Sequence, residues 1–234
     1  IAAVDIGYTA GIETTKVAPE WIEKCNTVVD RVLVVSNHSK KVFENTKYTV
    51  KDQHGADVPN WGMQVPVIAI NYPVIDVPAE DIEIELTTNN NFLVVSQWGP
   101  RKNLDNTIRW FVEEFKDDED AGLVVKTNIA ADCFTDREHT SVRLKALLSA
   151  YPDKKCKIYL VHGELTASQL KGLYTHDSMR ALINIGHGEG FGLPLFEAAY
   201  NGLPLITITW SGQMDFICRP NKKGKNYPRI IKVD

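Results

Sequence analysis

The feature that most constrains the fold is a regular alternation of short apolar runs and longer amphipathic segments between residues 90 and 208. Helical segments such as the one carrying Leu104, Ile108 and Phe111 separate runs with the length and composition of buried strands. The five runs are 92–96 (FLVVS), 122–126 (GLVVK), 157–161 (KIYLV), 181–185 (ALINI) and 205–208 (LITI). This pattern predicts a parallel sheet covered on both faces, the doubly wound, Rossmann-like α/β architecture. In such sheets ligands bind at the carboxyl ends of the strands, where the strand order changes.

The first 88 residues are a shorter α/β segment. Residues 31–35 (RVLVV) predict a strand, Ser36 and Asn37 a helix start, and residues 64–70 (QVPVIAI) another strand. Prolines, acids and asparagines between 73 and 91 are typical of a linker. We therefore expect one partial α/β domain with its linker over 1–88 and a second domain over 89–234. The start at Ile1 and the apolar end, which resembles the beginning of a strand, favour a fragment truncated at both ends.

Composition narrows the classes of protein that fit. The 234 residues carry a net charge of −4, which argues against a general nucleic-acid binder. No apolar run is long enough to span a membrane. The four cysteines are far apart, which favours reduced thiols in a cytoplasmic protein over a disulfide framework or a zinc site.

The most informative stretch is residues 186–197 (GHGEGFGLPLFE), where the fourth strand turns into a helix. Its glycines let the backbone approach a ligand closely, and the amides at the helix start form a natural anion site. Glu189 in the loop could accept hydrogen bonds from sugar hydroxyls, and Glu197 in the helix could bind a pair of ribose hydroxyls. The alternative is a plain glycine-rich turn with a chance pair of acids.

A second loop, residues 97–103 (QWGPRKN), follows the first strand of the same sheet. Arg101 and Lys102 there could neutralise a departing diphosphate. A solvated pair of surface cations is the alternative. If the sheet is parallel, both loops lie at its carboxyl edge, which favours a joint role.

These two loops resemble those of family 4 glycosyltransferases of the GT-B fold. The likeness rests on the PRKNL segment at 100–104 and on EGFGLP at 189–194, followed by Glu197 and by GLPL at 202–205. It covers nearly the whole chain, since residues 13–43 are similar to the end of the family's first domain. The resemblance implies that 1–88 is the remnant of the acceptor-side domain and 89–234 the domain that binds the nucleotide sugar.

The resemblance also implies roles for individual residues. Lys102 matches the lysine that holds the donor diphosphate, with Arg101 beside it, Glu189 the glutamate near the transferred sugar, and Glu197 the one that binds ribose. The backbone expected to cradle sugar and phosphates is that of Gly190, Phe191, Gly192 and Leu193. Many relatives carry an arginine shortly before the lysine, where this chain has Gln97 and Trp98.

Three further residues lie at the expected carboxyl edge. Lys126 ends the second strand and is a weaker ligand candidate; His162 and Gly163 end the third, near where the family binds the nucleotide base. For His162 a structural role is the favoured interpretation. No metal site is expected, because His187 has no suitably spaced partner and Asp118 to Asp120 form an acidic turn at the other edge of the sheet.

The sequence thus predicts a metal-independent glycosyltransferase that needs no cofactor and uses a UDP- or GDP-sugar as donor, and the resemblance implies that the reaction retains the anomeric configuration. Its acceptor would be a glycan, a lipid-linked sugar or a protein. The alternatives are a non-catalytic module that binds a nucleotide sugar or a protein, and an epimerase or phosphorylase of similar architecture. The basic stretch 219–229 is interpreted as an exposed loop, with an anionic membrane surface as a minor alternative contact.

Overall fold

The computed structural model describes residues 4–220, 226–228 and 231–232. The backbone forms two compact units. One consists of residues 1–73, 188–192 and 210–227, and the other of residues 74–187, 193–209 and 228–234. The domain boundary expected between 88 and 89 stays a prediction. Among the described residues, no helix has both the length and the apolar character needed to cross a bilayer.

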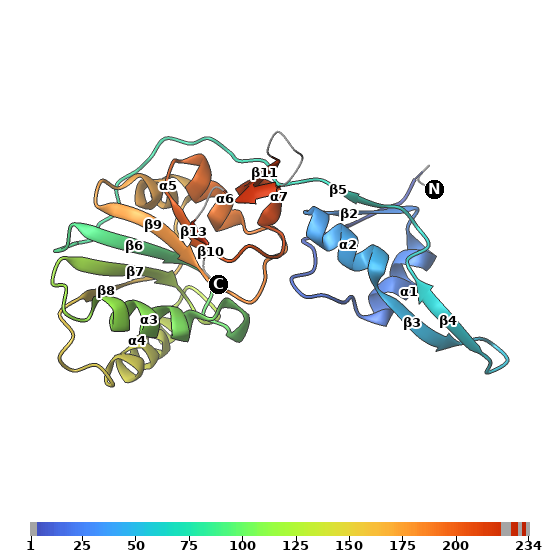
Figure 1. The fold of residues 1–234 in the computed structure, drawn as a ribbon, viewed down its shortest axis with the longest axis horizontal. Helices are drawn as coiled ribbons and strands as arrows, with labels where there is room; N and C mark the ends of the chain where they lie inside the picture. The colour runs from blue at the N-terminus through green and yellow to red at the C-terminus, as the bar shows by residue number, and fades with distance from the viewer. Residues whose placement is uncertain (1–3, 221–225, 229–230, 233–234) are drawn as a thin grey trace. The chain divides into compact units, whose positions relative to one another are not determined.

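The second unit is built on a parallel sheet, which confirms the predicted fold class (Figure 1). The strands that the apolar runs predict are β6 (Asn90–Val95), β7 (Ala121–Thr127), β8 (Lys157–His162), β9 (Met179–Asn184) and β10 (Leu205–Thr207). A further strand, β13 (Ile231–Lys232), pairs with β10 where the sequence suggested the beginning of a strand. The strand order is β13-β10-β9-β6-β7-β8. It reverses at β6, since β7 and β8 lie on one side of this strand and β9, β10 and β13 lie on the other.

Helices cover both faces of this sheet, as the alternation predicts. α3 (Leu104–Phe115) and α4 (Phe134–Leu148) lie on one face, and α5 (Ala167–Thr175) and α6 (Leu193–Tyr200) on the other (Figure 1). A capping box starts α5: the side chain of Thr166 accepts from the amide of Gln169, and the side chain of Gln169 accepts from the amide of Thr166. Gly202, at φ 83°, follows the end of α6.

The core of the second unit forms between the sheet and the α3–α4 layer. Leu104 and Ile108 of α3 are completely buried against Leu123 and Val125 of β7. Each such side chain contributes roughly 1.5–3 kcal/mol by leaving water. This burial fixes the start of α3, and with it the loop that carries Arg101 and Lys102.

The first unit contains a small parallel sheet in the order β1-β2-β5, formed by β1 (Ile6–Thr9), β2 (Arg31–Val34) and β5 (Val67–Ala69). The strand predicted over 64–70 is shorter than expected, because Pro66 has no amide to donate at its start. The remaining elements are α1 (Pro19–Val28), α2 (Asn37–Asn45), the hairpin of β3 (Lys47–Lys51) and β4 (Asp57–Gly62), α7 (Met214–Ile217), β11 (Cys218–Pro220) and β12 (Asn226–Pro228). Ser36 caps α2 as predicted, accepting from the amide of Ser39.

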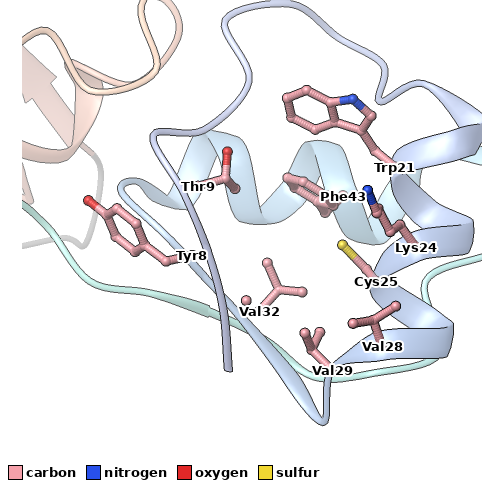
Figure 2. A pocket seen from close by; sticks show the side chains of 10 residues that line it. Tyr8, Thr9, Trp21, Lys24, Cys25, Val28, Val29, Val32 and Phe43 are labelled. Atoms are coloured by element: carbon pink, nitrogen blue, oxygen red, sulfur yellow. The ribbon is translucent and has the colours of Figure 1, made fainter. Parts of the chain in front are cut away.

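An apolar groove of about 450 Å³ lies in the first unit between β1 and α1. Figure 2 shows Trp21, Lys24 and Val28 of α1 on one side of it and Tyr8 of β1 on the other. Val32 and Phe43 form part of its lining. No residue that the sequence singles out as a site candidate lines this groove.

Candidate functional site

The loops that follow β6 and β9 contact each other at the point where the strand order reverses. The amide of His187 donates to the carbonyl of Arg101 at 2.8 Å, and Nδ2 of Asn103 donates to the carbonyl of Ile185 at 3.3 Å. A Cβ added to Gly186 would lie 3.2 Å from the carbonyl oxygen of Arg101 and 3.5 Å from Cα of Lys102. Residues 101–103 of the first motif and 185–187 at the start of the second therefore lie together within the second unit, although 85 positions separate Lys102 from His187.

The conformation of the first loop follows from its own residues. Pro100–Lys102 form a single 3₁₀ turn, which a proline at the first position favours. Asn103 then adopts a left-handed conformation (φ 54°, ψ 30°), which asparagine tolerates better than most residues. Trp98 is buried and donates from Nε1 to Asp105 at 2.9 Å, which ties the loop to the first turn of α3.

Residues 188–192 of the second loop belong to the compact unit that contains the N-terminal segment. Glu189 is buried, and its backbone is held by Ser211, whose hydroxyl accepts from the Glu189 amide at 2.6 Å and donates to its carbonyl at 2.8 Å. A Cβ on Gly190 would lie 2.5 Å from the carbonyl oxygen of Ala10, and one on Gly188 would overlap that of Glu13. Neighbouring backbone of the same unit therefore leaves no room for a side chain at either position.

The side chain of Phe191 packs within the protein. Its ring lies 5.5 Å from that of Tyr72 and 5.2 Å from that of Phe216, and it is buried. Only the backbone of Phe191 is consistent with the predicted cradle for sugar and phosphates. Gly192 has φ 89°, a conformation that favours glycine, and α6 begins at the next residue, Leu193. Backbone amides at the start of a helix point away from the helix, which suits such a position to an anion.

Glu197 lies in α6 and is held by a residue that the sequence did not single out. The hydroxyl of Tyr174, in α5, donates to Oε2 of Glu197 at 3.1 Å. Burial raises the pKa of Glu197, and the hydrogen bond from Tyr174 lowers it by a smaller amount. Burial also raises the pKa of Tyr174, so its proton stays in place to be donated. A small pocket lined by both side chains and by residues 74–77 lies beside this pair.

Lys126 and Gly163 lie at the carboxyl ends of β7 and β8, as predicted. Burial lowers the pKa of Lys126, while the nearby carboxylates of Glu164 and Asp132 act in the opposite direction. Asp132 accepts from the amide of Glu164 at 3.1 Å. Gly163 has φ 90°, and a Cβ there would overlap the carboxylate of Asp132, so glycine is required.

His162, the last residue of β8, points at a buried carboxylate. Its Nε2 lies 2.7 Å from Oδ1 of Asp136, and both side chains are almost fully buried. Asp136 is a second residue that sequence reasoning missed. The signal that could have found it was an acid in the first turn of a helix, directly after a loop at the carboxyl edge.

The other features that the sequence analysis weighed lie away from these loops. Asp118 and Asp120 are in the turn between α3 and β7, at the amino edge of the sheet, as expected for the acidic run. Part of the basic stretch, residues 221–225 and Arg229, lies outside the described residues. The cysteines are unpaired; Cys156 is buried and Cys133 is exposed.

Comparison with known proteins supports the same fold. No family model matches the chain. Two Escherichia coli proteins named serotype-specific mannosyltransferase WbdA are each 26% identical to it over 198 residues, which are 80% of this chain and 22% of theirs. The chain thus spans about a fifth of the length of these relatives.

Several solved glycosyltransferase structures share the architecture at low sequence identity. A mutant of S. aureus TarM, in complex with fondaparinux, alpha-GlcNAc-glycerol and UDP, has a TM-score of 0.58 and 15% identity, covering 91% of this chain and 36% of its own. The pneumococcal O-GlcNAc transferase GtfA, with UDP and GlcNAc, has a TM-score of 0.57 and 14% identity, covering 98% and 41%. Anabaena HepE, in complex with UDP and glucose, has a TM-score of 0.58 and 14% identity, and the match covers 92% of this chain and 55% of HepE. The chain therefore has a GT-B-like fold.

Proposed function

We propose that this chain carries the donor-binding site of a glycosyltransferase that moves a sugar from a nucleoside-diphosphate sugar to an acceptor hydroxyl. The contact between the Arg101–Asn103 loop and residues 185–187, at the reversal of strand order, carries the proposal. It is the position at which open α/β sheets bind nucleotides. The similarity to proteins named mannosyltransferases and the GT-B-like fold support it.

The chemistry requires a diphosphate to leave the anomeric carbon of the sugar. Negative charge grows on the leaving oxygen as that bond breaks, so preorganised positive groups lower the barrier. Lys102 and Arg101, together with the first amides of α6, are the groups that we assign to this role. Glu197 would bind the ribose hydroxyls, and Glu189 the transferred sugar.

Two finer features belong to the same proposal. The reaction would retain the anomeric configuration, and it would need no metal, since the two side-chain cations and the helix start supply positive charge. An NMR assignment of the product anomer tests the first feature, and activity in excess EDTA tests the second. The acceptor would be a glycan, a lipid-linked sugar or a protein, in the cytoplasm or at the surface of its membrane.

Calorimetric titration with UDP, GDP and their hexose derivatives tests the assignment. We expect at least one to bind, and we expect Lys102→Ala to weaken that binding roughly tenfold or more, because a charge-assisted contact to phosphate is lost. Lys116→Ala is the matched control, since this exposed lysine follows α3 at the other edge of the sheet. Equal affinity in wild type and both variants would overturn the assignment of Lys102, and no binding by wild type would overturn the function.

A further inference from the structure

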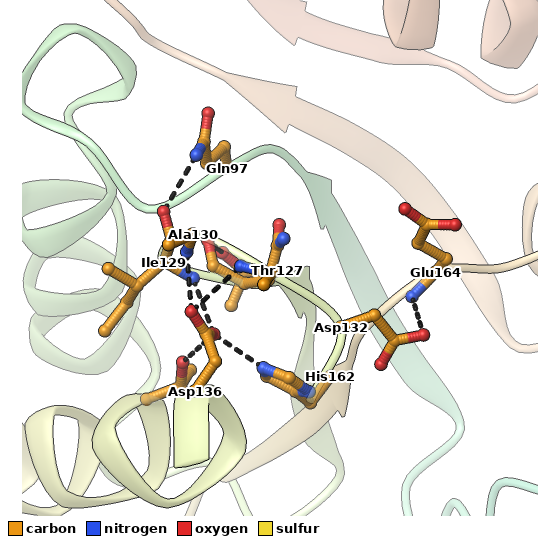
Figure 3. Close-up of polar contacts among 11 residues, drawn as sticks. Gln97, Thr127, Ile129, Ala130, Asp132, Asp136, His162 and Glu164 are labelled. Atoms are coloured by element: carbon orange, nitrogen blue, oxygen red, sulfur yellow. Dashed lines mark hydrogen bonds and ion pairs between the residues drawn. The ribbon is translucent and has the colours of Figure 1, made fainter. Parts of the chain in front are cut away.

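Asp136 is a heavily engaged carboxylate at the carboxyl edge of the sheet. It accepts hydrogen bonds from three successive backbone amides, at 2.9 Å from Ile129, 2.6 Å from Ala130 and 3.0 Å from Ala131. The hydroxyl of Thr140, one turn further along α4, donates to it at 3.2 Å. His162 contacts it from β8, as Figure 3 shows. A carboxylate with this many donors is held in its ionised form, and these contacts hold the pKa of Asp136 far below its ordinary value.

The loop that Asp136 holds is in turn bonded to the loop that carries the candidate cations. Nε2 of Gln97 donates to the carbonyl of Ile129 at 2.8 Å, and the amide of Trp98 donates to the carbonyl of Asn128 at 2.7 Å. Gln97 is one of the two residues at which the sequence departs from the resembled family's arginine. Here it links two loops of the same edge (Figure 3).

The third loop of this edge is connected to the same carboxylate. His162 ends β8 immediately before Gly163, whose amide donates to the carbonyl of Thr127 at 3.3 Å. Asp136 thus connects the segments that follow β6, β7 and β8 through one buried charge. Its removal would leave three loop amides and an imidazole without their acceptor in a nearly water-free place, which is costly.

We propose that Asp136 is a positioning residue for donor binding, which sets the loops after β6, β7 and β8 in the geometry that receives the nucleotide. It acts through backbone amides and His162 and need not touch the ligand. The inference rests on the proposed function. It extends that function by assigning the alignment of the donor site to a residue outside both motifs.

Asp136→Asn tests the inference. The carboxamide has nearly the same size, but its NH₂ group cannot accept, so the donors that now face one of the two carboxylate oxygens lose their acceptor. We expect the Kd for UDP or GDP, whichever binds the wild type, to rise roughly tenfold or more, because small displacements of positioning groups are costly. In the folded variant the number of sites per chain should stay near one. A merely structural role would lower the number of sites and leave the Kd of the folded fraction unchanged.

Asp120→Asn is the matched control at the amino edge of the sheet. Asp120 also accepts from a neighbouring segment, at 2.8 Å from the amide of Asn89 and 3.0 Å from Nδ2 of Asn90, the first residue of β6. We expect its Kd to equal that of the wild type. If Asp136→Asn binds as tightly as the wild type, or if Asp120→Asn loses as much affinity, the positioning role is refuted. Failure of the wild type to bind any nucleotide would instead refute the proposed function.

A measurement on the wild type keeps the inference testable if Asp136→Asn does not fold. Amide hydrogen exchange should show the amides of residues 129–131 protected, although they lie outside helix and strand, because Asp136 accepts from them. Protection should increase on addition of the nucleotide that binds. Rapid exchange of these amides, or protection that ligand does not change, would overturn the inference.

Discussion

Removing one hydroxyl from Tyr174 is expected to weaken both the fold and the proposed ribose contact. Tyr174→Phe deletes the donor that lies 3.1 Å from Oε2 of Glu197 and leaves the ring packed where it is, since the residue is 3% exposed. The carboxylate then loses its hydrogen bond in a partly desolvated place. The pKa of Glu197 should rise further above its ordinary value, because burial raises it and the lost bond lowered it.

The size of the effect follows from the burial of the two partners. A hydrogen bond to a charged group contributes about 1.5–3 kcal/mol. Glu197 is only partly buried, so water can replace part of the lost bond, and we expect a loss of about 1–1.5 kcal/mol in the free energy of unfolding. For a chain of this size that corresponds to a fall of roughly 2–6 °C in Tm.

Tyr151→Phe is the matched control for this experiment. Tyr151 donates to Glu113 at 2.8 Å in the same unit, but Glu113 is exposed and water can replace the bond. We expect a loss of at most about 0.5 kcal/mol there. Thermal melting followed by circular dichroism compares the two variants. Equal Tm shifts would refute the argument from burial, and an unchanged nucleotide affinity in Tyr174→Phe would refute the link between this hydrogen bond and ribose binding.

Three further outcomes are expected. Glu197→Gln should be more stable than the wild type near neutral pH and equally stable below about pH 4, because a raised folded-state pKa means that ionisation of Glu197 opposes folding. Denaturant titration at the two pH values measures this difference. The same variant should bind the nucleotide more weakly. Gly172→Ala should lower Tm although alanine favours helices, since its Cβ would overlap the carbonyl oxygen of Glu80; a higher Tm would contradict this. A thiol reagent should modify exposed Cys133 first and Cys156 only on unfolding, because Cys156 is buried and burial raises its pKa; mass spectrometry of partly labelled protein decides the order.

The parallel sheet could be predicted from the sequence because its signals are local. An apolar run such as 122–126 can be buried only as a strand between two helical layers. The capping box at the start of α5 involves just Thr166 and Gln169, which are three positions apart. The elements that the sequence analysis missed have weak patterns. β1 (Ile6–Thr9) is mostly exposed, and the β3–β4 hairpin shows almost no buried face, so neither carries the apolar periodicity by which strands are recognised.

The residues that hydrogen-bond to the side chains of the candidate site were harder to predict from the sequence. Glycine motifs and adjacent cations can be read locally, but the partners of Glu197 and His162 lie 23 and 26 positions away. These pairs arise only when α5 packs beside α6 and α4 packs against β8. The glycines at 188 and 190 show a related limit, since they suggested room for a ligand and the structure places backbone of residues 13 and 10 against them.

Mapping nucleotide binding residue by residue tests the central claim most directly. In backbone amide NMR spectra of the labelled chain, titration with the UDP or GDP species that binds should perturb residues 101–103 and 185–187 together, since these two segments are hydrogen-bonded to each other. Perturbation of only one loop, or of residues around the groove between β1 and α1, would contradict a donor site at the reversal of strand order.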